Sequence, residues 1–193
     1  MSKQKILILI FVLTAFAQIF VPAKMVFDSE QNIRQGNEFL FRLRPVDPND
    51  PFKGKYIMLY FEQNSFPVSD IEKKKSGASV YVLLTNDSEG YAQILSVQET
   101  PPIGEQDFIE ANIAYINSYD SLLIIDYPFN KYYMEESKAA LAEDIYREIR
   151  DKKTAYASVF VKNGKATLAG VYIDGVSIEQ LAKERQEELK SSQ

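Results

Sequence analysis

Residues 155–173 of the chain read AYASVFVKNGKATLAGVYI, two largely apolar runs joined by Asn163 and Gly164. Asn-Gly is the strongest short signal for a β-hairpin, because both central residues of the tight turn need positive φ. Residues 155–162 and 165–173 are therefore predicted to be paired antiparallel strands. This hairpin places the chain among proteins built on antiparallel sheet.

Other short runs carry the same signature of apolar, β-branched and aromatic residues bounded by turn residues. A second hairpin is predicted around the turn-rich residues 86–90, and residues 56–62 and 122–127 are apolar enough to be central strands. About eight strands are predicted, at residues 39–44, 56–62, 80–85, 91–97, 108–116, 122–127, 155–162 and 165–173.

Two helical patterns interrupt or follow these strands. Residues 135–150 place their apolar side chains on one stripe, and residues 177–180 read SIEQ, a capping box that opens a final helix. The predicted fold class is therefore α+β: an N-terminal transmembrane helix, then a mainly antiparallel β-sheet or sandwich domain with two packed helices.

The N-terminal segment is apolar from residue 6 to residue 21, interrupted only by Thr14 and Gln18. Its 16 residues would rise about 24 Å as a helix, and extension to Phe27 spans a bilayer core of about 30 Å if Lys24 reaches the interface. A transmembrane helix is predicted. A cleaved signal peptide, with VPA at 21–23 as its processing site, and a buried core helix of a cytosolic protein are the alternatives.

Three segments follow from these patterns. Residues 1–27 are predicted to be a signal-anchor transmembrane helix, residues 28–36 a helical stalk ending at Gly36, and residues 37–193 an extracytoplasmic mostly-β domain. Lys3 and Lys5 precede the apolar run and favour a cytoplasmic N-terminus. The expected location is the inner membrane of a bacterial envelope, crossed once, with the domain in the periplasm.

Composition excludes several classes of function. The chain has no His and no Cys, so it cannot form a Ser-His-Asp triad, a Cys-His dyad or a disulfide, and structural zinc is very improbable. A net charge of −5 argues against a nucleic-acid partner. Serines near the lysine run 73–75 lack the spacing of a Ser-Lys nucleophile, and that run is interpreted as a solvated loop, or else as a contact for anionic lipid. No cofactor and no metal is expected.

A proline-rich stretch is the most distinctive local feature. Residues 44–56 read RPVDPNDPFKGKY, and three prolines in seven residues forbid helix and stiffen the connection. Asp47, Asn49 and Asp50 carry oxygen ligands suited to Ca²⁺, but the EF-hand spacing is absent. Turns stabilised by Asx hydrogen bonds are the favoured interpretation.

Residues 41–61, FRLRPVDPNDPFKGKYIMLYF, resemble the GDYXXLXY family of membrane-anchored bacterial proteins. The name-giving motif falls on residues 54–61: Gly54, Tyr56 and Leu59 match it, whereas Lys55 replaces the acidic residue and Phe61 the final Tyr. Residues 129–135 (FNKYYME) and the NGKA of 163–166 leading to IDG at 173–175 are further matches.

The resemblance implies a location and a fold, and it assigns no activity. It also implies a multi-pass membrane protein as a partner. Because Lys55 stands at the acidic position of the motif, any mechanism that needs a carboxylate there is in doubt.

The expected function is a non-catalytic domain that binds a membrane-protein partner. A periplasmic small-ligand or glycan binding domain is the first alternative, and a His-free enzyme using Asp47, Asp50 and Glu135 is the second. Glu135 lies near a predicted helix start, where a carboxylate can serve a structural role by interacting favourably with the helix dipole. The functional alternative is an ion pair with Lys53 or Lys55. The candidate interaction surface comprises Asp47, Asp50, Lys53, Gly54, Lys55, Tyr56, Tyr132, Tyr133 and Glu135.

Overall fold

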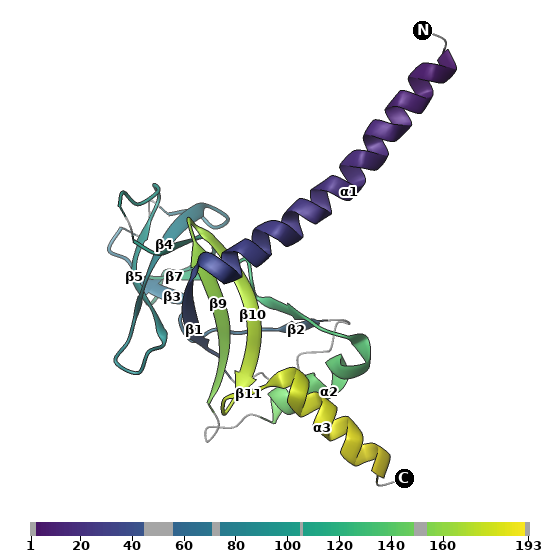
Figure 1. Ribbon diagram of the computed structural model, residues 1–193. Helices are drawn as coiled ribbons and strands as arrows, with labels where there is room; N and C mark the ends of the chain where they lie inside the picture. The colour runs from purple at the N-terminus through teal and green to yellow at the C-terminus, as the bar shows by residue number, and fades with distance from the viewer. Residues whose placement is uncertain (1–2, 45–55, 71–73, 105, 149–153, 192–193) are drawn as a thin grey trace.

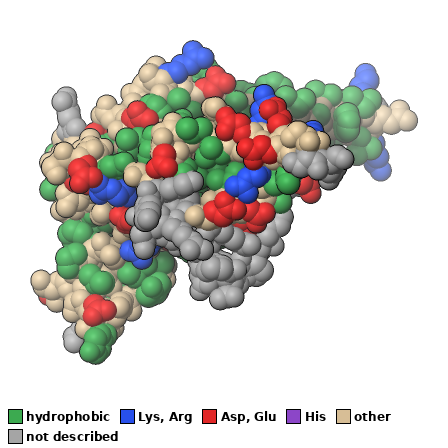
Figure 2. Space-filling view, turned by 90° about the horizontal axis from the view of Figure 1, so that it is seen from below, with side chains coloured by type: hydrophobic (Ala, Val, Ile, Leu, Met, Phe, Trp, Pro, Cys, Tyr) green, Lys and Arg blue, Asp and Glu red, His purple; other side chains and the backbone are tan. Residues whose placement is uncertain are grey.

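Most of the exposed large hydrophobic side chains of the described residues lie on one helix, α1 (Lys3–Gln35), which projects away from the rest of the protein (Figure 1). This computed structural model describes residues 3–44, 56–70, 74–104, 106–148 and 154–191. The helix is long and apolar enough to cross a membrane. Figure 2 shows it as a nearly continuous hydrophobic rod with basic side chains at its free end, a surface that lipid stabilises and water does not.

The predicted anchor and stalk form one uninterrupted helix. Pro22 lies inside it without ending it, and the helix ends at Gln35, one residue before Gly36. Gly36 ends the helix for a reason other than a left-handed cap: a Cβ at Gly36 would lie 2.6 Å from the Asn32 carbonyl oxygen and 2.9 Å from that of Val161. The glycine is therefore required by close backbone approach.

The four-stranded sheet contains the predicted Asn-Gly hairpin. Its order is β1 (Asn37–Arg42), β9 (Ala155–Lys162), β10 (Lys165–Ile173) and β11 (Val176–Ser177), with every pair antiparallel. Asn163 and Gly164 have φ of 51° and 83°, so both turn positions adopt the positive φ that the sequence predicted.

The second sheet has five strands, all antiparallel to their neighbours. Its order is β3 (Ser65–Pro67), β7 (Leu122–Asp126), β6 (Phe108–Asn117), β4 (Ser79–Asn86) and β5 (Ala92–Gln98). Residues 122–126 are central, as predicted. The hairpin tip of the first sheet touches this one, because the Glu110 amide donates to the Gly164 carbonyl oxygen at 2.9 Å.

Residues 56–62 do not form the single central strand that was predicted from the sequence. Among the described strands, β2 (Tyr56–Met58) pairs with β8 (Lys131–Tyr133) alone, in a two-stranded ribbon. The chain then changes partner: Arg44 donates to Tyr60 O at 2.7 Å and Glu62 donates to Arg42 O at 3.0 Å, beside the end of β1. An apolar run cannot reveal such a change of partner, because both halves bury the same alternate side chains.

Two helices complete the α+β fold. α2 (Glu136–Arg147) and α3 (Ile178–Ser191) lie together beside the end of the first sheet where β11 follows β10 (Figure 1). Ile178 and Ala182 of α3 are buried, and Arg185 clamps the Glu148 carboxylate with two hydrogen bonds of 3.2 and 2.9 Å. The capping serine, Ser177, accepts a weak hydrogen bond of 3.3 Å from the Gln180 amide.

One hydrophobic core joins the elements, and aromatic rings form its centre. Phe41 of β1 is fully buried and makes edge contacts with Phe61, Tyr127 and Phe129 at centroid distances of 5.6, 5.5 and 5.3 Å. These rings come from β1, from the segment after β2 and from the end of β7. Edge-to-face packing of this kind stabilises the core beyond the area it buries.

Candidate functional site

The β2–β8 ribbon brings together three of the predicted surface tyrosines. Its register pairs Tyr56 with Tyr133 and Ile57 with Tyr132. Successive side chains of a strand point to opposite faces, so the first pair lies on the outer face and the second on the inner one. Accordingly Ile57 is buried and Tyr132 packs against the core, whereas the Tyr133 side chain is 66% exposed.

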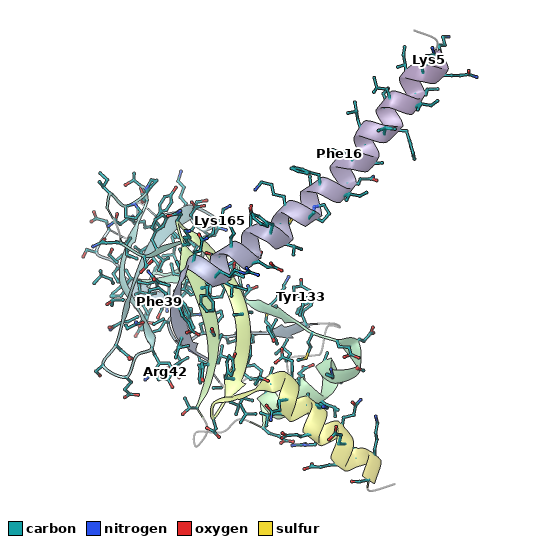
Figure 3. The ribbon with its side chains drawn as sticks, viewed as in Figure 1. Lys5, Phe16, Phe39, Arg42, Tyr133 and Lys165 are labelled. Carbon is teal, nitrogen blue, oxygen red and sulfur yellow. The ribbon has the colours of Figure 1, made fainter. Side chains whose placement is uncertain are left out.

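The outer face of the ribbon is an aromatic patch with one cation, here called the tyrosine patch (Tyr56, Lys131, Tyr133). The rings of Tyr56 and Tyr133 lie 5.4 Å apart at 55°, and the Lys131 ammonium lies 5.2 Å from the Tyr56 centroid. Figure 3 shows Tyr133 on the side of the domain from which α1 departs. Exposed tyrosines beside a cation are a common composition at protein interfaces.

Glu135 immediately precedes α2, and its side chain bonds to residues in the first turn of that helix. Its carboxylate accepts hydrogen bonds from Lys138 Nζ at 2.8 Å and Ser137 Oγ at 2.7 Å, and it caps no backbone N–H of α2. The hydrogen bond from Lys138, then that from Ser137, lowers the pKa of Glu135 below the usual carboxyl value. A carboxylate held ionised in this way suits charge pairing and is unsuited to donate a proton.

The structure describes four of the nine predicted surface residues. Asp47, Asp50, Lys53, Gly54 and Lys55 lie in residues 45–55, outside the described residues. The expected ion pair of Glu135 with Lys53 or Lys55 falls in the same segment. Over residues 56–70, 74–104, 106–148 and 154–191, no group of three or more acidic side chains is arranged to hold a metal ion.

The second half of the family motif builds the core. Leu59 and Phe61 are both 3% exposed, and Phe61 belongs to the aromatic cluster around Phe41. Two buried hydroxyls fix the flanking backbone: Tyr127 donates to Gln63 O at 2.7 Å, and Tyr146 donates to Arg44 O at 3.0 Å. Burial raises the pKa of both tyrosines, so they stay neutral and act as hydrogen-bond donors.

Asn32 joins α1 to the domain, and the sequence interpretation did not find it. Its side-chain amide donates to Phe160 O at 2.9 Å, Lys165 O at 3.2 Å and Thr167 Oγ1 at 2.8 Å, and the residue is 6% exposed. Gln35 accepts from Lys162 Nζ at 2.5 Å one turn further on. An isolated Asn in a polar helical stretch gives no sign of such contacts.

A charged cluster at the β4–β5 turn was also missed. Arg42 donates to Asp87 at 2.9 Å and to Glu89 at 2.6 Å, and its guanidinium lies 3.9 Å from the Tyr91 centroid. The Tyr91 amide, then the Glu89 amide and the Arg42 charge, lower the pKa of Asp87. All four groups satisfy one another, so this cluster stabilises the turn between β4 and β5.

Comparison with known proteins identifies the family and no characterised relative. No curated protein and no solved structure matches the chain. The model of the family described as GDYXXLXY protein matches residues 18–171, from the middle of α1 to the end of β10. That span includes the motif at 54–61, the β2–β8 ribbon and the Asn163-Gly164 hairpin. The chain belongs to the GDYXXLXY family.

Proposed function

We propose that this protein is a single-pass inner-membrane protein of the bacterial envelope whose periplasmic domain binds a membrane-protein partner without catalysing a reaction. Residues 1–27 are the retained anchor, residues 28–36 a stalk, and residues 37–193 the domain. The exposed apolar length of α1 supports the anchor. Lys3 and Lys5 at its start support a cytoplasmic N-terminus.

The tyrosine patch is the observation that carries the binding function. Tyr56 and Tyr133 are held by a strand pair over a buried Ile57, so their positions are set before any partner arrives. A patch that is already ordered loses little entropy on binding. Tyrosine contributes large contact area with only two rotatable side-chain bonds, and it is enriched among the residues that dominate binding energy.

Charge on the described surface supports binding over catalysis. Glu135, Asp87 and Glu99 all have lowered pKa values, and the largest cause is a hydrogen bond from Lys138, from the Tyr91 amide and from Lys74, respectively. General acids need the opposite shift. A small-ligand or glycan binding domain is the second candidate, since an exposed aromatic ring also suits a flat ligand face.

The binding function is tested by co-purification from detergent-solubilised native membranes with the full-length chain. Tyr133→Ala and Tyr56→Ala are expected to lower partner recovery while α1 keeps the variant in the membrane fraction. Tyr119→Ala is the matched control, because Tyr119 is 95% exposed in the turn between β6 and β7 and does not belong to the β2–β8 ribbon. Equal recovery with all three variants would remove the tyrosine patch from the proposal.

A further inference from the structure

One face of α1 continues from the part that docks on the domain into the part that is apolar. Residues spaced alternately by four and three share one face of a helix, which is the spacing of a packing seam between helices. At the domain end of α1 this seam consists of Asp28, Asn32 and Gln35. Towards the free end it consists of Leu7, Phe11, Thr14, Gln18, Val21 and Met25.

The domain end of this seam is occupied by the hairpin. Asp28 lies 3.9 Å from Lys165 Nζ, Asn32 binds Phe160, and Gln35 binds Lys162. Among the described residues, the rest of the seam has no neighbour in the domain: Figure 3 shows the side chains of α1 standing clear of it along most of the helix, with Lys165 beside its lower end. The seam drifts by only about 20° per heptad along an α-helix, so a helix that packs on the upper seam lies on the side of α1 that faces the β9–β10 hairpin.

Gln18 is the polar group that needs such a neighbour. It lies within about one helical turn of the midpoint of residues 6–27, where a bilayer offers no water to an amide. The Thr14 hydroxyl, one turn earlier, is satisfied by the Ile10 carbonyl oxygen at 2.9 Å. Within the part of the chain that the structure describes, the side-chain amide of Gln18 makes no hydrogen bond, and the residue lies on the seam.

We infer that the upper seam of α1 binds a transmembrane helix of another protein, which pairs a hydrogen-bonding side chain with Gln18 near the middle of the bilayer. This inference rests on the proposed function and names the intramembrane part of the same partner. Amide side chains hydrogen-bond between transmembrane helices, and polar residues within a span usually face other helices. The opposite face, where Phe16 and Phe20 stack at 5.6 Å, is suited to lipid.

A second copy of the chain does not fit this seam. Two helices that pack through seam side chains approach to about 8–10 Å. In a symmetric pair, each copy would carry its own β9–β10 hairpin on the same face, because Asn32 and Gln35 hold the hairpin there. Two hairpins cannot enter a gap of that width. A helix that ends at the membrane surface meets no such obstacle and would sit on top of the hairpin.

The test uses the whole chain in native membranes. The chain has no natural Cys, so an introduced Cys is its one labelling site. Gln18→Leu is expected to reduce partner recovery by about three- to tenfold, the loss of one interhelical hydrogen bond. Phe16→Leu on the opposite face is the matched control and is expected to leave recovery unchanged. Neither change makes the span less apolar in a way that prevents insertion.

Site-specific cross-linking identifies the face and the occupant. Met25→Cys lies on the seam and Phe27→Cys lies across the helix, and the two native side chains are 65% and 59% exposed. With a photoreactive group on the new thiol, Met25→Cys is expected to cross-link to a different membrane protein, and Gln18→Leu in the same chain is expected to abolish that product. Phe27→Cys is expected to give none.

Three results would overturn the inference. A Met25→Cys product at twice the mass of the chain would make the occupant a second copy. Equal products from Met25→Cys and Phe27→Cys would remove the seam. Full partner recovery with Gln18→Leu would remove Gln18 while leaving the proposed function intact. If the unaltered chain recovers no partner at all, the proposed function itself fails, which is distinguishable from these three.

Discussion

Asn32 donates its side-chain amide to the carbonyl oxygen of Phe160 at 2.9 Å, across 128 positions of the chain. With the bonds to Lys165 O and Thr167 Oγ1, this contact fixes α1 on the hairpin. The apolar helix and the domain therefore share one rigid junction, and the orientation of the domain is set by the helix.

The Asn32 junction predicts a loss of stability on substitution. Asn32→Leu removes the three hydrogen bonds that the buried Asn32 amide donates, and the free energy of unfolding is expected to fall by about 1–3 kcal/mol. Chemical unfolding of the full chain in detergent measures it. Gln31→Leu is the control, because Gln31 is exposed on the adjacent position of the helix. Equal stabilities of the two variants would contradict the role assigned to Asn32.

The hairpin turn gives a second prediction. Comparing Gly164 with Gly175 separates the cost of backbone strain at positive φ from the cost of a steric clash with a neighbouring side chain. Gly164 has φ of 83°, and a Cβ there would lie 2.6 Å from Phe108 Cε2; Gly175 has φ of 82° with nothing within 4 Å. Gly175→Ala is expected to lower stability by about 1 kcal/mol, through backbone strain alone. Gly164→Ala is expected to lower it further. A Gly164→Ala variant no worse than Gly175→Ala would show that the hairpin tip is not packed against β6.

Much of this architecture was predictable because the decisive signals are local. Asn163-Gly164 predicts its hairpin from two residues, and the long apolar run predicts α1. The division of residues 56–62 between two partners was not predictable, because Leu59 and Phe61 alternate as a single strand would while their hydrogen bonds go to Asn130 and to the end of β1.

The candidate site was predictable only in its aromatic part. Tyr56 and Tyr133 meet because β2 and β8 pair, and the aromatic pair in the FNKYYME segment indicated one half of that contact. Asn32 could not be found in this way: its three acceptors lie more than a hundred residues away, and nothing near it in the sequence reports them.

Tyr127 makes the stability of the domain sensitive to alkaline pH. Burial raises its pKa above the usual value of about 10, so the neutral phenol is favoured in the folded state. Its contribution is fully present below about pH 10 and is lost as the pH rises through the folded pKa. Tyr127→Phe should cost about 1 kcal/mol at neutral pH, through the lost bond to Gln63 O.

Unfolding measured between about pH 8 and pH 11 checks this prediction, because the range crosses the ordinary tyrosine pKa. The Tyr127→Phe variant is expected to lose less stability over that range than the unaltered chain. Tyr133→Phe, which removes the hydroxyl of an exposed ring, is the control variant. Parallel slopes for Tyr127→Phe and the unaltered chain would contradict the prediction.

Asp87 gives the opposite dependence at acid pH. Its pKa is lowered, first by the Tyr91 amide, so its contribution is present above the usual carboxyl pKa of about 4 and is lost as the pH falls through the folded pKa. Asp87→Asn should be less stable than the unaltered chain at neutral pH, with a difference that shrinks in acid. Arg42→Gln is expected to keep part of the acid dependence, because the hydrogen bond from the Tyr91 amide, the largest cause of the lowered pKa, remains. Loss of the entire acid dependence in Arg42→Gln would show that Arg42, and not the Tyr91 amide, is the main cause of the lowered Asp87 pKa.

The orientation of α1 is a further prediction, and it depends on the charges at the two ends of the apolar run. Lys3 and Lys5 precede residue 6, whereas Lys24 on the far side is paired with Asp28 at 2.5 Å and contributes little net charge there. Basic residues near a span are retained in the cytoplasm, so the domain is expected outside it. A reporter fused after Gln193 should be active only outside the cytoplasm, and replacement of both Lys3 and Lys5 by Glu should reduce that activity.

Mass spectrometry of the membrane fraction should find the peptide containing Lys3 and Lys5, whereas a mature chain that begins at Lys24 would show that the segment is a cleaved signal. Export would survive that result, but the seam of α1 would then have no bilayer to lie in, so the same measurement also decides whether Gln18 can have an intramembrane partner.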